Sequence, residues 1–279
     1  MEKILSFNMF REYFLKRKIA KGEVKVWTSK DYYDNKERLG NNGYLQENKE
    51  VEEPVIVETP RTIKQYPNLI VCLDNGHASS TPGKRSSYLC SGVLPALALY
   101  EYEFNRRVTT VLQRKLEQSG VIVFMVCPEK DKDISLTARY TRANNFVAKN
   151  PGKRALLISV HANAHGDGKS WTNARGWCAY TTKGQNNSDK LAECLYDEAE
   201  KIFLPKGLSI RTEFSDKDRD WESNFTIIYG ANMPAVLTEN FFYTNIEDTR
   251  YLLTEEAIED IAEVHYRAIL KFAEQQYKM

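Results

Sequence analysis

Short apolar runs alternate with longer amphipathic segments along the chain from residue 68 onward. Apolar runs of this length are typical of strands that are covered on both faces of a sheet. We expect strands at residues 69–73, 121–126, 155–160, 176–181 and 235–238. The amphipathic segments repeat apolar residues three and four apart, which predicts helices at residues 101–119, 135–149, 188–203 and 255–273. Such alternation predicts an α/β fold of three layers, with helices flanking a twisted, mostly parallel sheet.

The first 62 residues differ in composition from the rest of the chain. A basic and aromatic stretch opens this region, and an acidic run that contains proline, at residues 51–60, closes it. The closing run has the composition of a linker. We therefore expect a small N-terminal extension and linker over residues 1–62, followed by one main domain over residues 63–279.

Composition excludes several classes of partner. The chain carries 39 basic and 38 acidic residues, a formal net charge of +1, so it has no strong field with which to gather nucleic acid. No apolar run approaches the roughly 18 residues of a membrane span, so stable membrane insertion is not expected. Five cysteines without a C-x-x-C pair indicate buried, reduced thiols. The first ten residues lack a small-residue cleavage site, so we expect synthesis in the cytoplasm without a conventional signal peptide.

Three polar residues follow the predicted strands directly. His77 comes three residues beyond the first strand, His161 follows residues 155–160, and Glu239 follows residues 235–238. Because the carboxyl ends of parallel strands meet at one edge of a sheet, we expect these side chains to lie at the functional edge.

A fourth polar residue is out of place on the first predicted helix. The apolar stripe of this helix runs through Phe104, Val108, Leu112 and Leu116, and its continuation backwards falls on Glu101. Glu103 instead lies on the polar face. A carboxylate on the buried side is costly unless it is paired or coordinates a cation.

Two imidazoles and one carboxylate are the three protein ligands of many catalytic zinc sites. With Zn2+ at His77, Glu101 and His161, Glu239 would take the proton of an attacking water during amide hydrolysis. On the residues alone, structural histidines and a Glu101 paired with an arginine remain alternatives.

Five ordered blocks cover nearly all of residues 68–279: LIVCLDNGH (69–77), ExxxN (101–105), LxxRxxxAN (136–144), LISVHANA (157–164) and MPAVLTE (233–239). Together they resemble the zinc N-acetylmuramoyl-L-alanine amidases of the Amidase_3 type. The resemblance implies a six-stranded twisted sheet flanked by helices, and a catalytic domain over residues 63–279. It also implies Zn2+ held by His77, Glu101 and His161, with Glu239 catalytic. The implied substrate is the peptidoglycan amide between N-acetylmuramic acid and L-alanine.

The sequence departs from that family around the first ligand. Asn75-Gly-His-Ala-Ser79 stands where the family usually has Pro-Gly-His-Gly-Gly, and the interval of 24 residues between His77 and Glu101 is longer than usual. We expect residues 79–99 to form a rim that contacts glycan or peptide, or covers the metal. Asn163 and Arg219 are the candidate substrate-binding residues, Arg219 because arginine suits carboxylate recognition.

Three hypotheses about function follow. The first is a bacteriolytic amidase that degrades the cell wall, such as a phage or prophage endolysin that reaches the wall after release from the cytoplasm. The others are a zinc peptidase that acts on the stem peptide, and a wall-binding module that keeps the amidase fold without turnover. A free N-terminal L-alanine beside intact muramic acid would identify the amidase.

Overall fold

The computed structural model describes residues 63–86, 98–215 and 217–279. The predicted N-terminal extension lies outside the described residues, as does most of the predicted rim, so both stay predictions. The position of the boundary between residues 62 and 63 likewise stays a prediction.

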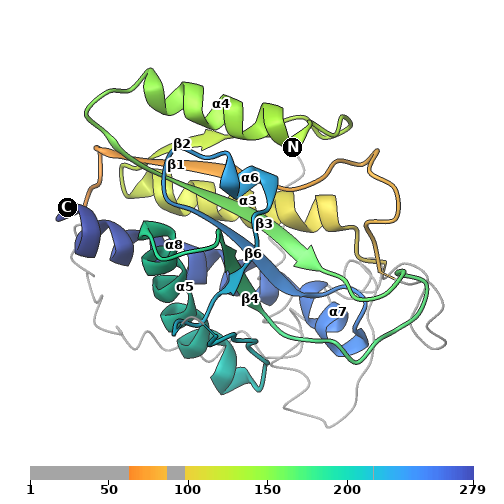
Figure 1. The fold of residues 1–279 in the computed structure, drawn as a ribbon. Helices are drawn as coiled ribbons and strands as arrows, with labels where there is room; N and C mark the ends of the chain where they lie inside the picture. The colour runs from red at the N-terminus through yellow and green to blue at the C-terminus, as the bar shows by residue number, and fades with distance from the viewer. Residues whose placement is uncertain (1–62, 87–97, 216) are drawn as a thin grey trace, which may run out of the picture. The chain divides into compact units, whose positions relative to one another are not determined.

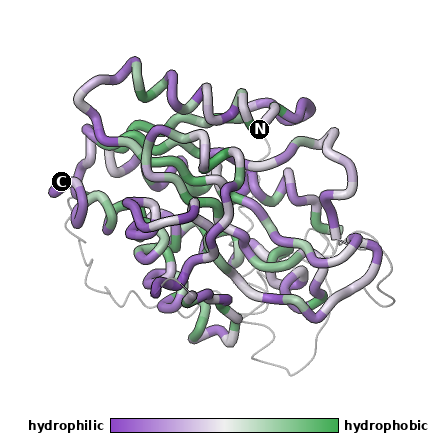
Figure 2. The backbone as a smooth tube through the Cα atoms, viewed as in Figure 1, coloured by the Kyte–Doolittle hydropathy of each residue, from purple (hydrophilic) through white to green (hydrophobic). Residues whose placement is uncertain are grey.

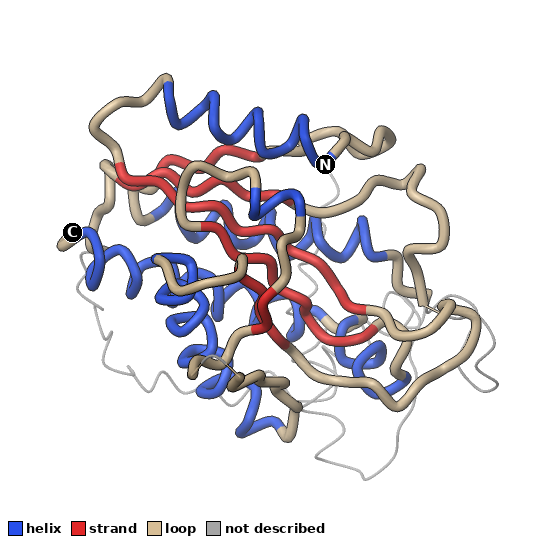
Figure 3. The backbone as a smooth tube through the Cα atoms, viewed as in Figure 1, coloured by secondary structure: helices blue, strands red, loops and turns tan. Residues whose placement is uncertain are grey.

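Six strands form one sheet at the centre of the described domain (Figures 1 and 3). They are β1 (Leu69–Asp74), β2 (Ile122–Met125), β3 (Arg154–Asn163), β4 (Cys178–Thr181), β5 (Trp221–Glu222) and β6 (Ala235–Phe242). Their order across the sheet is β2-β1-β3-β6-β4-β5. All neighbours pair in parallel except β4 and β6, which are antiparallel. The predicted α/β class and the mostly parallel sheet are confirmed.

Helices cover both faces of the sheet (Figure 1). The longer ones are α3 (Glu101–Gln118), α4 (Leu136–Ala148), α5 (Asn187–Phe203) and α8 (Glu255–Tyr277), and the shorter ones are α6 (Thr226–Tyr229), α7 (Ile246–Leu252) and the 3-10 helix η2 (Leu204–Lys206). Helices α3, α5 and α8 pack on one face, and α4 and α6 pack on the other. Among the described residues, no helix is both long and apolar enough to cross a bilayer.

Strand β1 is apolar from Leu69 to Leu73 because both of its faces are covered. Leu69, Val71 and Leu73 point to the core on the side of α3 and α8, whereas Ile70 and Cys72 point to the core on the side of α4. Figure 2 shows the hydrophobic positions gathered in these central strands. Both faces of the strand are buried, so a polar side chain on it needs a buried partner, as Asp74 at its end has in Arg139. The four described cysteines are free and buried, as predicted.

Two strands continue past the ends that the sequence predicts. Strand β3 reaches Asn163 and β6 reaches Phe242, so His161 and Glu239 lie within strands and are paired in register with each other. The apolar runs stop earlier because these side chains face the functional edge, while the backbone pairing continues. The ladder therefore fixes both side chains more firmly than a loop would.

His265 on α8 is the buried polar link between this helix and β6. Its Nδ1 lies 2.6 Å from the carbonyl oxygen of Ile261, to which it donates, so its Nε2 accepts from the hydroxyl of Thr238 at 2.9 Å. Burial lowers the pKa of His265 from 6.5 to about 4, against the opposing effect of Ile261. The neutral ring is therefore part of the folded core.

Burial of the neutral His265 ring should make the free energy of unfolding depend on pH. The unfolded chain takes up the proton near pH 6.5, so the stability contribution is complete above that pH and is lost as pH falls towards 4. The pKa difference corresponds to about 3 kcal/mol. We expect urea unfolding to show a smaller loss of stability between pH 7 and pH 4.5 in His265→Gln than in the wild type. His165→Gln, at an exposed histidine, is the matched control and should retain the wild-type pH dependence.

Candidate metal centre

Three side chains that are far apart in the sequence converge at the carboxyl edge of the sheet. His77 comes from the loop after β1, Glu101 is the first residue of α3, and His161 projects from β3. Each of them offers one ligand atom, and these atoms all lie within 4.8 Å of one another. His161 Nδ1 lies 3.0 Å from Glu101 Oε1, and His77 Nε2 lies 3.4 Å from Glu101 Oε2. The structure thus brings together the three residues that the sequence predicts as metal ligands.

Glu101 is a buried carboxylate with an incomplete set of donors. Glu101 is 1% exposed, whereas Glu103 is an exposed residue, as the helical periodicity predicts. Oε1 accepts from the backbone N–H of Ala162 at 3.3 Å, but Oε2 has no hydrogen-bond partner among the described residues. A buried carboxylate oxygen without a donor is unfavourable unless a cation compensates it. This carboxylate, with His161 Nδ1 beside Oε1 and His77 Nε2 beside the unpartnered Oε2, fits a metal ion.

The charges of the three groups depend on one another. Burial opposes ionisation of Glu101, but the hydrogen bond and charge of His161 outweigh it, and the pKa of Glu101 lies below its ordinary value. Burial lowers the pKa of His77 to about 4, although Glu101 opposes this. The pKa of His161 is raised: burial alone would lower it, and Glu101 reverses that effect. An ionised carboxylate and a neutral His77 are the forms in which side chains bind metal.

Glu239 stands beside this cluster without belonging to it. It is the register partner of His161 on the neighbouring strand, and its Oε2 is buried with no hydrogen-bond partner among the described residues. Burial raises the pKa of Glu239 to about 7, and the charge of His161 opposes part of that rise. A carboxyl group with such a pKa accepts and returns a proton near neutral pH, which is the requirement for a general base.

A buried polar network positions His161 from the side of β6. Asn240 donates from Nδ2 to the carbonyl oxygen of His161 at 2.8 Å, and its Oδ1 accepts from Trp177 Nε1 at 2.9 Å. Asn240 is completely buried. The register of the two strands shifts just beyond His161, and this amide bridges the irregularity. The histidine is therefore held by both the ladder and a side chain.

The loop that carries His77 adopts a left-handed backbone. Gly76 has φ +31° and His77 has φ +57°, a conformation that residues with a side chain rarely adopt. A Cβ at Gly76 would lie 2.4 Å from His161 Cε1 and 2.8 Å from Asn105 Nδ2. The absence of a side chain at residue 76 is thus what allows the two histidines to approach.

We expect Gly76→Ala to displace His161 and to weaken metal binding by about 10- to 100-fold, the range seen when the surroundings of a ligand are disturbed. Chelator competition measures this affinity. Gly152→Ala is a matched control, because Gly152 also has a left-handed backbone, at φ +82°, but a Cβ there would meet nothing within 4 Å. An unchanged affinity in Gly76→Ala would show that the site tolerates a shifted imidazole.

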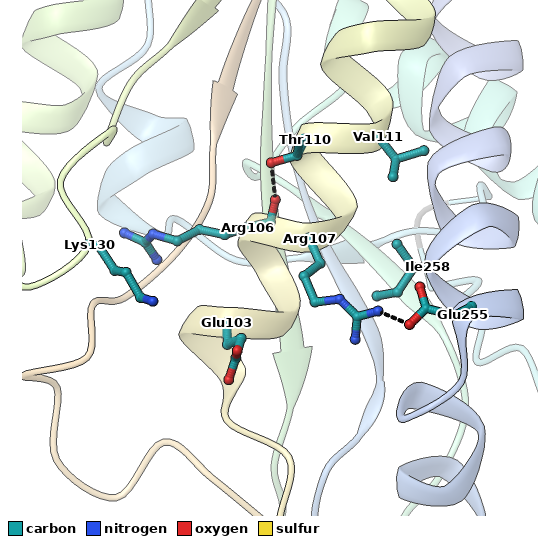
Figure 4. A pocket seen from close by; sticks show the side chains of 8 residues that line it. All are labelled: Glu103, Arg106, Arg107, Thr110, Val111, Lys130, Glu255 and Ile258. Carbon is teal, nitrogen blue, oxygen red and sulfur yellow. Dashed lines mark hydrogen bonds and ion pairs between the residues drawn. The ribbon is translucent and has the colours of Figure 1, made fainter. Parts of the chain in front are cut away.

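Arg106 holds the other side of the His77 loop. Its Nη1 donates to the carbonyl oxygen of His77 at 2.9 Å and to that of Tyr102 at 3.0 Å, and its Nη2 donates to the carbonyl of Glu129. The guanidinium crosses from α3 towards the loop of Lys130 and lines a surface pocket of about 460 Å³ (Figure 4). One side chain therefore joins the helix, the ligand loop and the loop after β2.

Loss of this clamp should loosen the metal site without unfolding the domain. We expect Arg106→Ala to reduce zinc affinity by about 10- to 100-fold, measured by chelator competition. Arg107→Ala is the control, because Arg107 pairs with Glu255, whose side chain is 75% exposed, and such surface pairs contribute about 1 kcal/mol or less. Equal affinities in the two variants would contradict a positioning role for Arg106.

The structure accounts for Arg219 without a substrate. Its guanidinium forms ion pairs with Glu193, Asp197 and Glu200 of α5, at 2.7, 2.6 and 3.0 Å. These three acids lie three and four residues apart and so share one face of the helix. Its charge is already neutralised within the fold, so a contact between Arg219 and substrate stays a prediction.

Asn163 lies near the cluster, at the end of β3 and two residues beyond His161. Its side-chain oxygen accepts from the backbone N–H of Ala164 at 2.8 Å. The half-buried amide keeps its two side-chain donors for other contacts, so its role towards substrate stays a prediction.

A second group of potential ligands, Asp189, Asp218 and Asp220, contains no imidazole. The hydroxyl of Thr181 lies 3.0 Å from Asp189 Oδ1 and 2.6 Å from Asp220 Oδ2. This cluster joins β4 to the start of α5 and to the segment before β5. We assign it to the fold.

The fold and the site together define an α/β protein with a candidate metal centre at the carboxyl edge of its sheet. The chain matches the N-acetylmuramoyl-L-alanine amidase family, Amidase_3, over residues 71–271, and it belongs to that family. It is 25% identical over 200 residues to the endolysin of Bacillus phage SPP1, a match that covers 72% of this chain and 64% of the relative. It is 24% identical to the amidase CwlM of Bacillus licheniformis, covering 72% and 67%. The match thus spans about two thirds of the length of these curated relatives.

Solved structures show the same fold. An N-acetylmuramoyl-L-alanine amidase from Clostridium difficile 630 superimposes with a TM-score of 0.61 at 24% identity, covering 75% of this chain and 99% of that one. The amidase Ami1 of Mycobacterium smegmatis gives a TM-score of 0.59 at 19% identity, covering 76% and 100%. The six-stranded sheet with flanking helices is therefore the architecture of the family.

Proposed function

We propose that this chain is a zinc-dependent amidase that hydrolyses the amide bond between N-acetylmuramic acid and L-alanine of peptidoglycan. The observation that carries the proposal is the convergence of His77, Glu101 and His161 around an unpartnered carboxylate oxygen, with Glu239 in register beside them. Membership of the amidase family supports the bond and the substrate.

The residues have separate duties in this reaction. His77, Glu101 and His161 would hold Zn2+, which when bound polarises the substrate carbonyl and lowers the pKa of water. Glu239 accepts the proton of the water whose oxygen joins the carbonyl carbon. As the carbon–nitrogen bond breaks, Glu239 returns the proton to the departing amine of L-alanine. The products are a free lactyl carboxylate on muramic acid and a stem peptide with a free N-terminus.

Glu239 suits this double duty because its pKa, raised to about 7 by burial, lies near the pH at which the reaction would run. The amide of Asn163 is proposed to contact the substrate at the same edge. We further propose that the enzyme acts on the cell wall, in the manner that the name endolysin gives to the relative from phage SPP1.

Product analysis of digested peptidoglycan tests the proposal. Zinc-loaded protein should release peptides with N-terminal L-alanine and leave muramic acid intact, and chelation should stop the release. New N-termini only from within the stem peptide would instead identify a peptidase. Wall binding without any new N-terminus would identify a non-catalytic module, and either result would overturn the proposed function.

A further inference from the structure

Lys84 places a cation at the metal site that no motif of the sequence marks. Its Nζ lies 4.0 Å from Glu101 Oε2, the carboxylate oxygen that has no hydrogen-bond partner among the described residues. It comes from the long interval between His77 and Glu101. The ammonium of Lys84 is therefore close enough to a proposed metal ligand to act on groups that react at the metal.

The backbone fixes Lys84 against the start of α3. Its carbonyl oxygen accepts from the N–H of Glu101 at 3.0 Å. Two residues on, Ser86 N–H donates to the carbonyl of Leu99, and Leu99 N–H donates to the Ser86 hydroxyl, at 2.8 and 2.9 Å. The backbone of Lys84 is thus hydrogen-bonded directly to the residue whose carboxylate its side chain approaches.

The side chain of Lys84 is 41% exposed, although its tip reaches a carboxylate that is almost completely buried. It therefore extends from solvent into the site. Its positive charge favours the ionised form of Glu239 as well as that of Glu101, and it disfavours protonation of His77. The field of this one ammonium therefore reaches Glu101, Glu239 and His77.

A divalent cation bound to Glu101 would weaken the attraction between that carboxylate and the ammonium of Lys84. The cation neutralises Glu101, the lysine then faces a like charge, and the ammonium is most stable beside a new anionic oxygen. Amide hydrolysis creates such an oxygen, because negative charge develops on the carbonyl oxygen as water attacks. A fixed cation aimed at that charge lowers the barrier without reorganising during the reaction.

Building on the proposed amidase function, we propose that Lys84 is a further catalytic residue, whose ammonium donates a hydrogen bond to the carbonyl oxygen of the scissile amide and stabilises the developing oxyanion. The lysine keeps its proton throughout, and it forms and breaks no covalent bond. Its contribution is made in the transition state, so it raises kcat rather than ground-state binding.

Kinetics with soluble N-acetylmuramoyl-tripeptide test the proposal. We expect Lys84→Met, which keeps the length but loses the charge, to lower kcat by about 100- to 1,000-fold, the effect of removing one oxyanion donor, with KM within about twofold of the wild type. Lys84→Arg should recover at least about tenfold of that loss, because it restores the charge. Lys149→Met, at an exposed lysine that ends α4, is the control and should match the wild type.

Zinc affinity, measured by chelator competition, is the second readout. Because Lys84→Met removes a like charge close to the site, it should bind zinc as tightly as the wild type or more tightly. Weaker zinc binding would show a structural role and overturn the proposal. If Lys84→Met raised KM and left kcat unchanged, Lys84 would bind a stem-peptide carboxylate in the ground state. If its kinetics equalled those of the wild type, Lys84 would be only a counter-ion of Glu101. Either result would overturn the proposal. A wild-type chain without amidase products would instead overturn the proposed function itself.

Discussion

His161→Ala and His77→Ala are each expected to lose bound zinc and all measurable amidase activity. Each substitution leaves one imidazole and one carboxylate, too few to hold a tetrahedral zinc with a site open for substrate. Changes around a ligand already weaken binding by about 10- to 100-fold, and loss of a ligand itself should exceed that range. Zinc content after dialysis, together with release of N-terminal L-alanine, measures both effects on one sample.

Glu101→Ala and Glu103→Ala form the matched pair for this experiment. Both are glutamates of the first turn of α3, but Glu101 is buried in the cluster and Glu103 is exposed. Loss of Glu101 should remove zinc, whereas loss of Glu103 should leave zinc content and turnover nearly unchanged. Equal zinc loss in both variants would contradict the assignment of Glu101 as a ligand. Far-UV circular dichroism would show that each variant retains the fold.

The candidate site was predictable where a polar residue broke a regular pattern. Glu101 interrupts the apolar stripe of a helix, and His77, His161 and Glu239 follow apolar runs that read as strands. The α/β class was predictable for the same reason, because buried parallel strands and amphipathic helices have distinct periods. Each of these signals is local, so it can be found without knowing how the chain folds back on itself.

The parts that could not be predicted depend on contacts between distant segments. Lys84 reaches the site because its loop is hydrogen-bonded to the start of α3, and Arg106 does so because the His77 loop folds against that helix. Strand β4 pairs with β6 in the antiparallel direction, and the apolar run at β4 does not indicate in which direction the strand pairs. The pairing of Arg219 with acids of α5 was likewise not predictable from its charged loop. Pairing between surface charges is set by tertiary structure.

Replacing Glu239 is expected to separate catalysis from metal binding. Glu239→Gln preserves the shape and removes the base, and Glu239→Ala removes both, yet neither change touches a ligand. We expect both variants to keep the zinc content of the wild type and to lose about 100- to 10,000-fold in kcat, the range for a missing general base. Parallel measurement of zinc content and product release distinguishes this result from that of the histidine variants.

The pH profile gives the sharpest form of this prediction. Burial raises the pKa of Glu239 to about 7 in the protein without metal, and a bound cation would lower it from there by favouring the carboxylate. The wild-type enzyme should therefore lose activity as pH falls through a value at or below about 7, because protonation removes the base. Residual activity of Glu239→Gln should lack this limb. A Glu239→Gln enzyme with full activity, or with the wild-type acid limb, would assign the proton transfer to another group and end the role proposed for Glu239.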